Sequence, residues 1–284
     1  MRYARPVKAI KQAVFVFALA GCVSSTPAPL PGGGTSDASV PAPADGGIAD
    51  TSTPPPPVDG QAGFRSLFDG VGLASHWDRY LGIPIGETAA LGLENDPRGV
   101  YSVVMEDGEP AIRISGEVWG ALISKEELSD FELRLEYKFG TLVYPPLNAF
   151  DSGVMVLSTG ALGAVNAGGD ALSNPVGSGA FMVSMEYQLV NGDIGANYNL
   201  GPIGKLPGLR TVLKERPTGW NQIGIVVRGA SSEHFLNGQH VDNGSGYELR
   251  MPGQPAVPLT KGKIQLQSEG CEIYFRRIQV RPAK

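Results

Sequence analysis

Polar side chains, most of them charged or amide, recur at every second residue along three short stretches of the chain. They lie in 131–139, 181–189 and 263–268 at Glu132, Arg134, Glu136, Lys138, Ser184, Glu186, Gln188, Lys263, Gln265 and Gln267. This alternation places the polar side chains of each stretch on one face of a β-strand. Glu and Arg interleaved with paired Gln can bind the hydroxyl groups of a ligand. A sheet that simply faces solvent also needs a polar face, so both interpretations stay open.

The apolar positions between these polar ones predict a two-layered β-structure. The expected inward residues are Leu133, Leu135, Tyr137, Phe139, Val183, Met185, Tyr187 and Leu189. We predict strands at 131–139, 152–157, 181–189, 223–228, 263–268 and 272–280, with Asn237-Gly238 forming a tight turn. No long stretch of the domain carries helical periodicity. The pattern therefore predicts an all-β sandwich of two antiparallel sheets.

The first residues of the chain predict export and lipid anchoring. Arg2, Arg5, Lys8 and Lys11 precede the apolar run 13–20, which is too short to span a bilayer. Leu19-Ala20-Gly21-Cys22 then matches the lipobox of a bacterial lipoprotein. We expect residues 1–21 to be a signal peptide and Cys22 to carry the lipid. The alternative is an ordinary secretory signal that happens to contain a cysteine.

Composition separates a tether from a folded domain. Residues 22–62 are rich in Pro, Gly, Ser, Thr, Ala and Asp and contain Pro54–Pro57, so they cannot bury enough apolar surface to fold. We expect one domain over 63–284. Val23 rather than Asp after the lipidated cysteine favours the outer membrane of a Gram-negative envelope. The lipid is then the only expected contact with the membrane.

Charge and cysteine content exclude several classes of function. The whole chain has a formal net charge of −5, and the predicted signal contains basic but no acidic residues, so the mature chain is more acidic still. An acidic chain without a basic cluster argues against nucleic-acid binding. Cys271 is the only cysteine besides Cys22, which excludes a disulfide framework and a cysteine-rich zinc site. No cofactor is expected, although loop oxygen atoms could build a structural calcium site.

An ordered series of segments carries a resemblance to one family. The segments are Gly63–Gly70, Gly120–Ser124, Asp130–Tyr137, Asp151–Val154, Met185–Leu189, Trp220–Asn221, Leu236–Gly238, Gln265–Gln267 and Phe275–Ile278. Over 63–284 the chain resembles the 3-keto-disaccharide hydrolase family, also called 3-keto-glucoside 1,2-lyase/3-keto-2-hydroxy-glucal hydratase. The resemblance implies a concanavalin A-like jelly roll of two packed antiparallel sheets.

Three segments depart from the family pattern. Glu269-Gly270 stands where the family usually has His-Gly, and Val156–Ser158 stands where an Arg often follows. Ile194–Tyr198 replaces a Thr-Gly-Ala-Leu-Tyr segment. All three are expected near the concave face of the sandwich. Either the substrate differs from that of the family, or activity has been lost while glycan binding remains.

The resemblance implies elimination chemistry on a keto sugar. A ketone at C3 acidifies the hydrogen at C2, a base removes it, the C1 substituent leaves, and water then adds to the glucal. Such a site needs a base, an acid and donors for the enolate oxygen. We expect Glu136 and Glu186 to be the catalytic carboxylates. The expected substrate-binding residues are Arg134, Gln188, Asp151, Gln265, Gln267, His234 and Glu269. A packed or surface role for His234 is the alternative.

Other classes of function differ in their carboxylates. An endoglycanase of the same fold would carry Glu-x-Asp-x-x-Glu on one strand, and this chain has no such run. A non-catalytic glycan-binding lipoprotein and a purely structural one remain as alternatives. Convergence of Glu136 and Glu186 in one cleft beside Arg134 would favour the enzyme, and divergence would favour the binding module.

Overall fold

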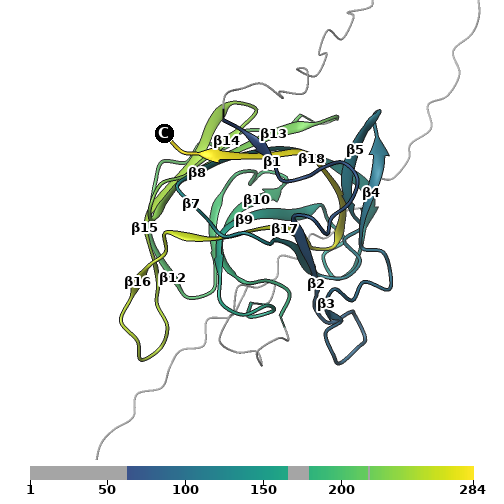
Figure 1. The fold of residues 1–284 in the computed structure, drawn as a ribbon, viewed down its shortest axis with the longest axis horizontal. Coiled ribbons are helices and arrows are strands. Elements are labelled where there is room, and N and C mark those ends of the chain that lie inside the picture. The colour runs from purple at the N-terminus through teal and green to yellow at the C-terminus, as the bar shows by residue number, and fades with distance from the viewer. Residues whose placement is uncertain (1–62, 166–178, 217) are drawn as a thin grey trace, which may run out of the picture. The chain divides into compact units, whose positions relative to one another are not determined.

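The computed structural model describes residues 63–165, 179–216 and 218–284 (Figure 1). The predicted signal peptide, lipidation at Cys22 and tether lie outside these residues. Every regular element in the described ranges is a β-strand, which confirms the all-β prediction. No helix in this part of the chain is long and apolar enough to cross a membrane.

The first sheet is built around the long strand β8. Its order is β12 (Ile203–Pro207), β15 (Gln239–Leu249), β14 (Ser231–Leu236), β13 (Asn221–Val227), β8 (Phe131–Val143), β18 (Cys271–Pro282), β5 (Glu109–Ile114) and β4 (Tyr101–Glu106). Two short strands join it, β1 (Arg65–Ser66) on β18 and β16 (Val257–Pro258) on β15. The pairings in this sheet are antiparallel.

The second sheet contains the other strands of the sequence prediction. Its order is β11 (Asn197–Leu200), β10 (Val183–Val190), β9 (Asp151–Thr159), β17 (Lys261–Ser268), β6 (Gly120–Ser124), β2 (Trp77–Leu81) and β3 (Gly92–Leu93), with β7 (Leu128–Ser129) beside β17. Figure 1 shows β8 and β18 arching over β9, β10 and β17. The arrangement is the antiparallel jelly-roll sandwich that the sequence predicts.

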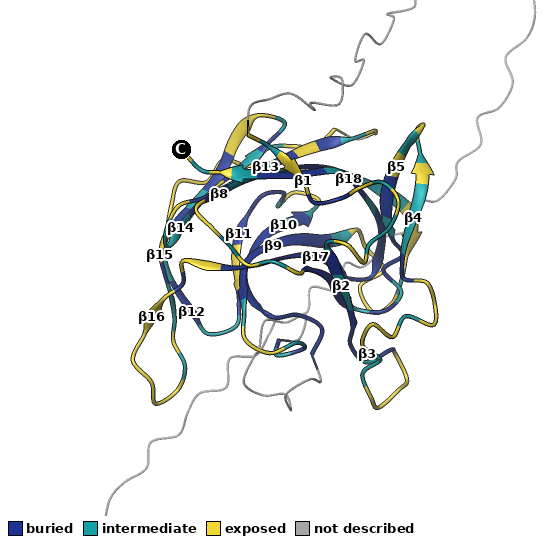
Figure 2. Ribbon diagram, in the orientation of Figure 1, coloured by how far each residue is buried: buried dark blue, intermediate teal, exposed yellow. Residues whose placement is uncertain are grey.

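The core fills the space between the two sheets, and the predicted inward faces are correct. Leu133 and Leu135 of β8 are buried in it, as are Met185, Tyr187 and Leu189 of β10. The Tyr187 hydroxyl donates to the backbone carbonyl of Phe235 on β14 at 3.1 Å, which joins the two sheets directly. Figure 2 shows long buried stretches along β9, β10, β17 and β18. These strands therefore pack against protein on both faces over much of their length.

The strand bounds differ from the sequence prediction mainly at the ends. β8 continues to Val143 rather than ending at residue 139, and β13 begins at Asn221 rather than residue 223. Phe181 lies in an isolated bridge to Val165, so β10 begins at Val183. Asn237 and Gly238 both have positive φ, 50° and 81°, as the predicted tight turn between β14 and β15 requires.

Candidate active site

Strand register brings the predicted polar residues of the second sheet onto one surface. Glu186 of β10 pairs with Met155 of β9, and Met155 in turn pairs with Gln265 of β17. Paired residues of neighbouring strands point to the same side of a sheet. Because Tyr187 points toward the first sheet, Glu186 points away from it. We call this side the outer face of the second sheet.

Glycine at position 153 lets two polar side chains lie close to the backbone of β9. A Cβ at Gly153 would be 2.4 Å from Glu186 Oε1 and 2.6 Å from Gln267 Oε1. These distances are far below van der Waals contact, so any other residue would displace at least one of the two groups. The carboxyl group of Glu186 also hydrogen-bonds with the Gln267 side chain. Gly153 therefore positions both groups on the outer face.

Three carboxyl groups on this face share one electrostatic environment, and we call them the carboxyl trio: Asp151, Glu186 and Glu269. Glu186 and Glu269 are only 4% and 6% exposed. Burial, with a contribution from Asp151, raises the pKa of Glu186 to about 8. Burial, with the charges of Glu186 and Asp151, also raises the pKa of Glu269 well above its usual range. In this poorly solvated site, the charge of Asp151 disfavours ionisation of both Glu186 and Glu269.

Asp151 is the strongest acid of the trio. Burial raises its pKa to about 6, and a hydrogen bond from the backbone of Ser152 opposes that rise. At neutral pH Asp151 is therefore mostly ionised and Glu186 mostly protonated, and the pKa of Glu269 is shifted in the same direction as that of Glu186. The group titrates as a coupled set, so these ionisations belong to the trio together. An anionic base and a protonated acid thus occupy one face, which is the combination that acid–base chemistry needs.

Two acceptor atoms at the site are buried without a hydrogen-bond donor among the described residues. They are Asp151 Oδ1 and Gln267 Oε1. An unsatisfied buried acceptor costs free energy that a ligand hydroxyl can recover. Gln265 differs, because its Oε1 accepts from the Met182 backbone N–H at 3.1 Å and its Nε2 donates to Ser158 Oγ at 2.9 Å. Both polar atoms of the Gln265 side chain are therefore used in hydrogen bonds within the protein, which stabilise this site.

The expected convergence of Glu136 with Glu186 is wrong. Glu136 belongs to β8 of the first sheet, and its side chain points away from the core on the opposite side of the sandwich. A bulge in β18 places two consecutive arginines beside it: Arg276 Nε lies 2.7 Å from Glu136 Oε2, and Arg277 Nη1 lies 3.1 Å from Oε1. Glu136 and Glu186 both lie on the polar side of their strands. The polar sides of the two sheets face away from the core in opposite directions, so the two side chains lie on opposite sides of the sandwich.

Two further predicted binding residues also lie away from the trio. Arg134 of β8 accompanies Glu136 on the first sheet, where its Nε donates to Gln279 Oε1 at 2.8 Å. His234 is fully buried between the sheets, with its Nδ1 3.0 Å from the Gly195 carbonyl and its Nε2 3.1 Å from Ser232 Oγ. Burial lowers the pKa of His234 to about 4, so it is neutral at physiological pH. The packed-histidine alternative describes its position.

Gln188 lies on the outer face, two residues from Glu186 on the same strand. It pairs with Gly153, and its Oε1 accepts the backbone N–H of Leu189 at 3.1 Å.

Within the described ranges, no group of three or more His, Cys, Asp or Glu side chains is arranged to hold a metal ion. A structural calcium ion remains a prediction from the sequence.

Sequence reasoning groups Glu136, rather than Asp151 or Glu269, with Glu186 as a catalytic carboxylate. Asp151 and Glu269 are both expected binding residues, and the structure places them on the same face as Glu186. A local signal was present, because Glu269 continues the alternation of Lys263, Gln265 and Gln267. Position 269 departs from the family His, and its carboxyl group completes the trio.

The fold and the site define a carbohydrate-related jelly-roll protein. Residues 63–281 match the family model described as the 3-keto-alpha-glucoside-1,2-lyase-like domain. This match covers most of the chain, and the protein belongs to that family. None of the curated proteins matches it.

The solved structures that resemble this protein are distant from it in sequence. A proposed glycosyl hydrolase from Parabacteroides distasonis ATCC 8503 is 17% identical, with 78% of this chain and 94% of that chain covered and a TM-score of 0.45. A second one from the same organism is 22% identical, covers 66% and 92% of the two chains, and has a TM-score of 0.39. The carbohydrate-binding module CBM66 from Bacillus subtilis is 10% identical, covers 64% and 91%, and has a TM-score of 0.37. At these values the likenesses carry no argument about activity.

Proposed function

We propose that the protein is an enzyme that cleaves 3-keto-glycosides by elimination across C1–C2 followed by hydration. The observation that carries the proposal is the carboxyl trio, in which the buried Glu186 and Glu269 share a face with Asp151, whose Oδ1 has no hydrogen-bond donor among the described residues, and burial raises the pKa of all three. Membership of the family supports the choice of a keto sugar as substrate. The proposed base is therefore Asp151 rather than Glu136.

In the first half-reaction Asp151 takes the proton from C2 of the 3-keto sugar. The electrons of the C2–H bond form an enolate that the C3 ketone stabilises. The C1–O bond then breaks, and Glu186 gives its proton to the departing oxygen. Glu269, whose pKa burial raises well above its usual range, donates a hydrogen bond from its protonated form to the enolate oxygen. Each proton transfer by a positioned side chain contributes typically about 10²–10⁴-fold to the rate.

In the second half-reaction the same residues exchange roles. Glu186 is now a carboxylate and takes a proton from a water molecule that adds to C1. Asp151 returns its proton to C2, which regenerates the starting protonation states. The sum of both steps is hydrolysis of the glycosidic bond. The buried acceptor Gln267 Oε1 supplies a partner for a sugar hydroxyl during both steps.

A non-catalytic glycan-binding protein is the second candidate. The divergence of Glu136 and Glu186 favours it, because Arg134 and Glu136 cannot contact a sugar that is bound at Glu186. The departure at Glu269 also favours it if the family reaction depends on histidine there. In that case the trio would bind an unoxidised sugar through hydrogen bonds alone.

Turnover of a chromogenic 3-keto-α-glucoside distinguishes the two candidates. The full chain should release the aglycone, and Asp151→Asn and Glu186→Gln should each slow release by about 10²-fold or more. Glu132→Gln is the matched control, since this carboxylate pairs with Arg281 on the first sheet, and it should retain the full rate. Undiminished turnover in both trio variants would contradict the assignment. Binding of the unoxidised glucoside that Asp151→Asn or Glu186→Gln weakens, without any turnover by the full chain, would favour the binding protein.

A further inference from the structure

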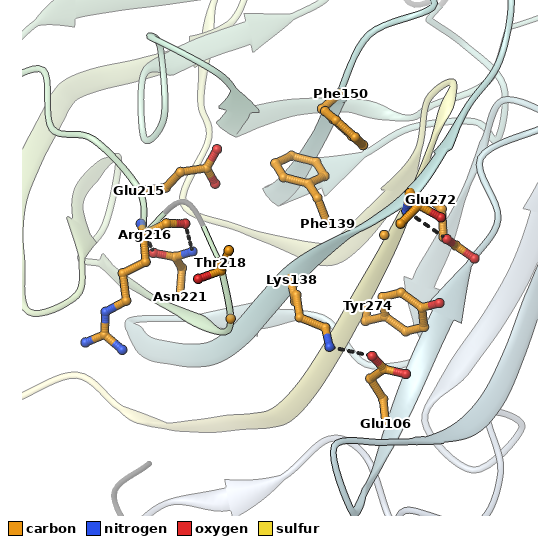
Figure 3. Close-up of a pocket in the computed structure, with 13 residues that line it drawn as sticks. Glu106, Lys138, Phe139, Phe150, Glu215, Arg216, Thr218, Asn221, Glu272 and Tyr274 are labelled. Carbon is orange, nitrogen blue, oxygen red and sulfur yellow. Dashed lines mark hydrogen bonds and ion pairs between the residues drawn. The ribbon is translucent and has the colours of Figure 1, made fainter. Parts of the chain in front are cut away.

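A separate hollow of about 420 Å³ lies where β8 runs past the end of its neighbour β13 (Figure 3). Pairing between these strands ends at Tyr137 and Asn221. Beyond that point β8 pairs only with β18 among the described strands. The hollow has none of the carboxyl trio in its lining. Its volume lies within the range of about 300–1,000 Å³ that is usual for small-ligand sites.

Aromatic rings give the hollow an apolar surface. The rings of Phe139 and Phe150 are 5.3 Å apart between centroids and inclined at 43°. Phe150 is 39% exposed, and Tyr274 lines the hollow as well. Figure 3 shows the two phenyl rings close together, with Glu215 on one side of them and Tyr274 on the other. Solvent-exposed rings beside a recess are suited to cover the C–H face of a ligand.

The polar groups of the hollow are held in place before any ligand binds. Glu215 Oε2 accepts a hydrogen bond of 2.8 Å from the Tyr137 hydroxyl, and no described residue donates to its Oε1. Burial raises the pKa of Glu215. The backbone N–H of Arg216 donates to Asn221 Oδ1 at 2.8 Å, and Asn221 Nδ2 donates back to the Arg216 carbonyl at 3.3 Å. A preorganised wall lowers the ordering cost of binding.

Charge selects the kind of ligand that this hollow can hold. Lys138 is already paired with Glu106 and Asp107, and Glu272 is paired with Arg113 at 2.7 Å. The charged groups of the lining without an ion-pair partner among the described residues are Glu215 and Arg216, which have opposite signs; Arg216 Nη1 donates to the Trp220 carbonyl at 3.5 Å, and its other N–H groups can reach a ligand. A ligand with a large net charge would be repelled by one of them. A neutral ligand that can both donate and accept hydrogen bonds satisfies both.

We propose that this hollow binds a neutral glycosyl unit of an oligosaccharide at a second site, apart from the carboxyl trio. A pyranose ring has a C–H face that suits Phe139, Phe150 and Tyr274. It also has a rim of hydroxyl groups that can donate to Glu215 Oε1 and accept from Arg216. A sugar held there need not be a 3-keto sugar, so binding in the hollow and turnover at the trio are independent properties.

Saturation-transfer NMR and calorimetric titration of the full chain with maltotriose and with cellotriose test the proposal. At least one trisaccharide should bind the wild type, and Asp151→Asn and Glu186→Gln should bind it equally well. Phe150→Ala should weaken binding by about fivefold or more through loss of the ring contact. Glu215→Gln keeps the shape and the acceptor for Tyr137 but removes the charge, so it should weaken binding by about threefold or more.

Tyr198→Ala is the matched control, because it removes an exposed aromatic ring on β11 outside the hollow, and it should bind normally. Melting temperatures identify any variant that has lost its fold, and the isosteric Glu215→Gln provides the test if Phe150→Ala does not fold. The proposal is overturned if neither trisaccharide binds. It is also overturned if binding survives both hollow variants or is lost in the trio variants.

Discussion

The carboxyl group of Glu186 and the amide of Gln267 meet over a residue that has no side chain. An ideal Cβ on Gly153 would lie 2.4 Å from the first and 2.6 Å from the second. The two groups come from β10 and β17, which flank β9 on either side. The position of the proposed acid therefore depends on the lack of a side chain at position 153.

Gly153→Ala should therefore displace Glu186 and remove most of the activity. Forcing one extra methyl group into a well-packed site typically costs about 1–3 kcal/mol of stability. Turnover of the 3-keto-α-glucoside and urea unfolding measure the two effects. Gly72→Ala is the matched control, because a Cβ at Gly72 meets no atom within 4 Å, and it should change neither quantity. A fully active Gly153→Ala would mean that Glu186 need not remain where the structure places it.

The pH dependence of turnover should be bell-shaped. Asp151 must be ionised to act as base, so the rate rises through its pKa of about 6. Glu186 must be protonated to act as acid, so the rate falls again through its pKa of about 8. Initial rates of aglycone release between these limits and beyond them measure both limbs. A rate that continues to rise at pH values above the pKa of Glu186 would contradict its role as the acid.

The same trio makes the fold less stable as the solution becomes more basic. The pKa of Glu186 is raised from 4.5 to about 8, so the native state holds this proton more tightly than the unfolded chain. Its contribution to stability is complete below the unfolded pKa and is lost as pH rises through the folded pKa. Urea unfolding should show this decline between about pH 5 and 8, and Glu186→Gln should reduce it. An unchanged slope in the variant would contradict the raised pKa.

Glu136 should matter for stability rather than for catalysis. Its partner Arg276 is only 2% exposed, and Glu136→Gln removes the carboxylate that contacts the Arg276 guanidinium. Breaking one side of a buried ion pair typically costs about 3–5 kcal/mol. Urea unfolding should show this loss, while the folded fraction of Glu136→Gln keeps its turnover. The double variant with Arg276→Met removes the buried charge, which in Glu136→Gln has only Glu109 at 3.7 Å as an ion-pair partner, and should recover part of the stability. If Glu136→Gln is stably folded but has lost turnover, Glu136 takes part in the reaction after all.

Lipid anchoring is tested at Cys22. If the lipobox interpretation is correct, Cys22→Ser cannot take up diacylglycerol and should appear in the soluble fraction of the cells that express it. Wild-type protein should take up radioactive palmitate and separate with outer membranes. A Cys22→Ser variant that still carries the label would contradict the interpretation.

Strand type and strand faces followed from the sequence, because they depend on local alternation. The inward residues Leu135 of β8 and Tyr187 of β10 were identified correctly, since successive side chains of a strand point to opposite sides. The Asn237-Gly238 turn was likewise correct, because Asn and Gly adopt positive φ more readily than other residues. The resemblance to the family also needed only the order of the segments, and the family match over residues 63–281 bears it out.

Which polar faces meet was decided only by the tertiary structure. Nothing local in the sequence places Glu136 in the first sheet and Glu186 in the second, because sheet membership depends on contacts between residues far apart in the chain. The trio shows the same limit. Asp151 and Glu269 reach Glu186 through the pairing of β17 with β9 and of β9 with β10. Their raised pKa values follow from burial, and burial exists only once the sheets have packed.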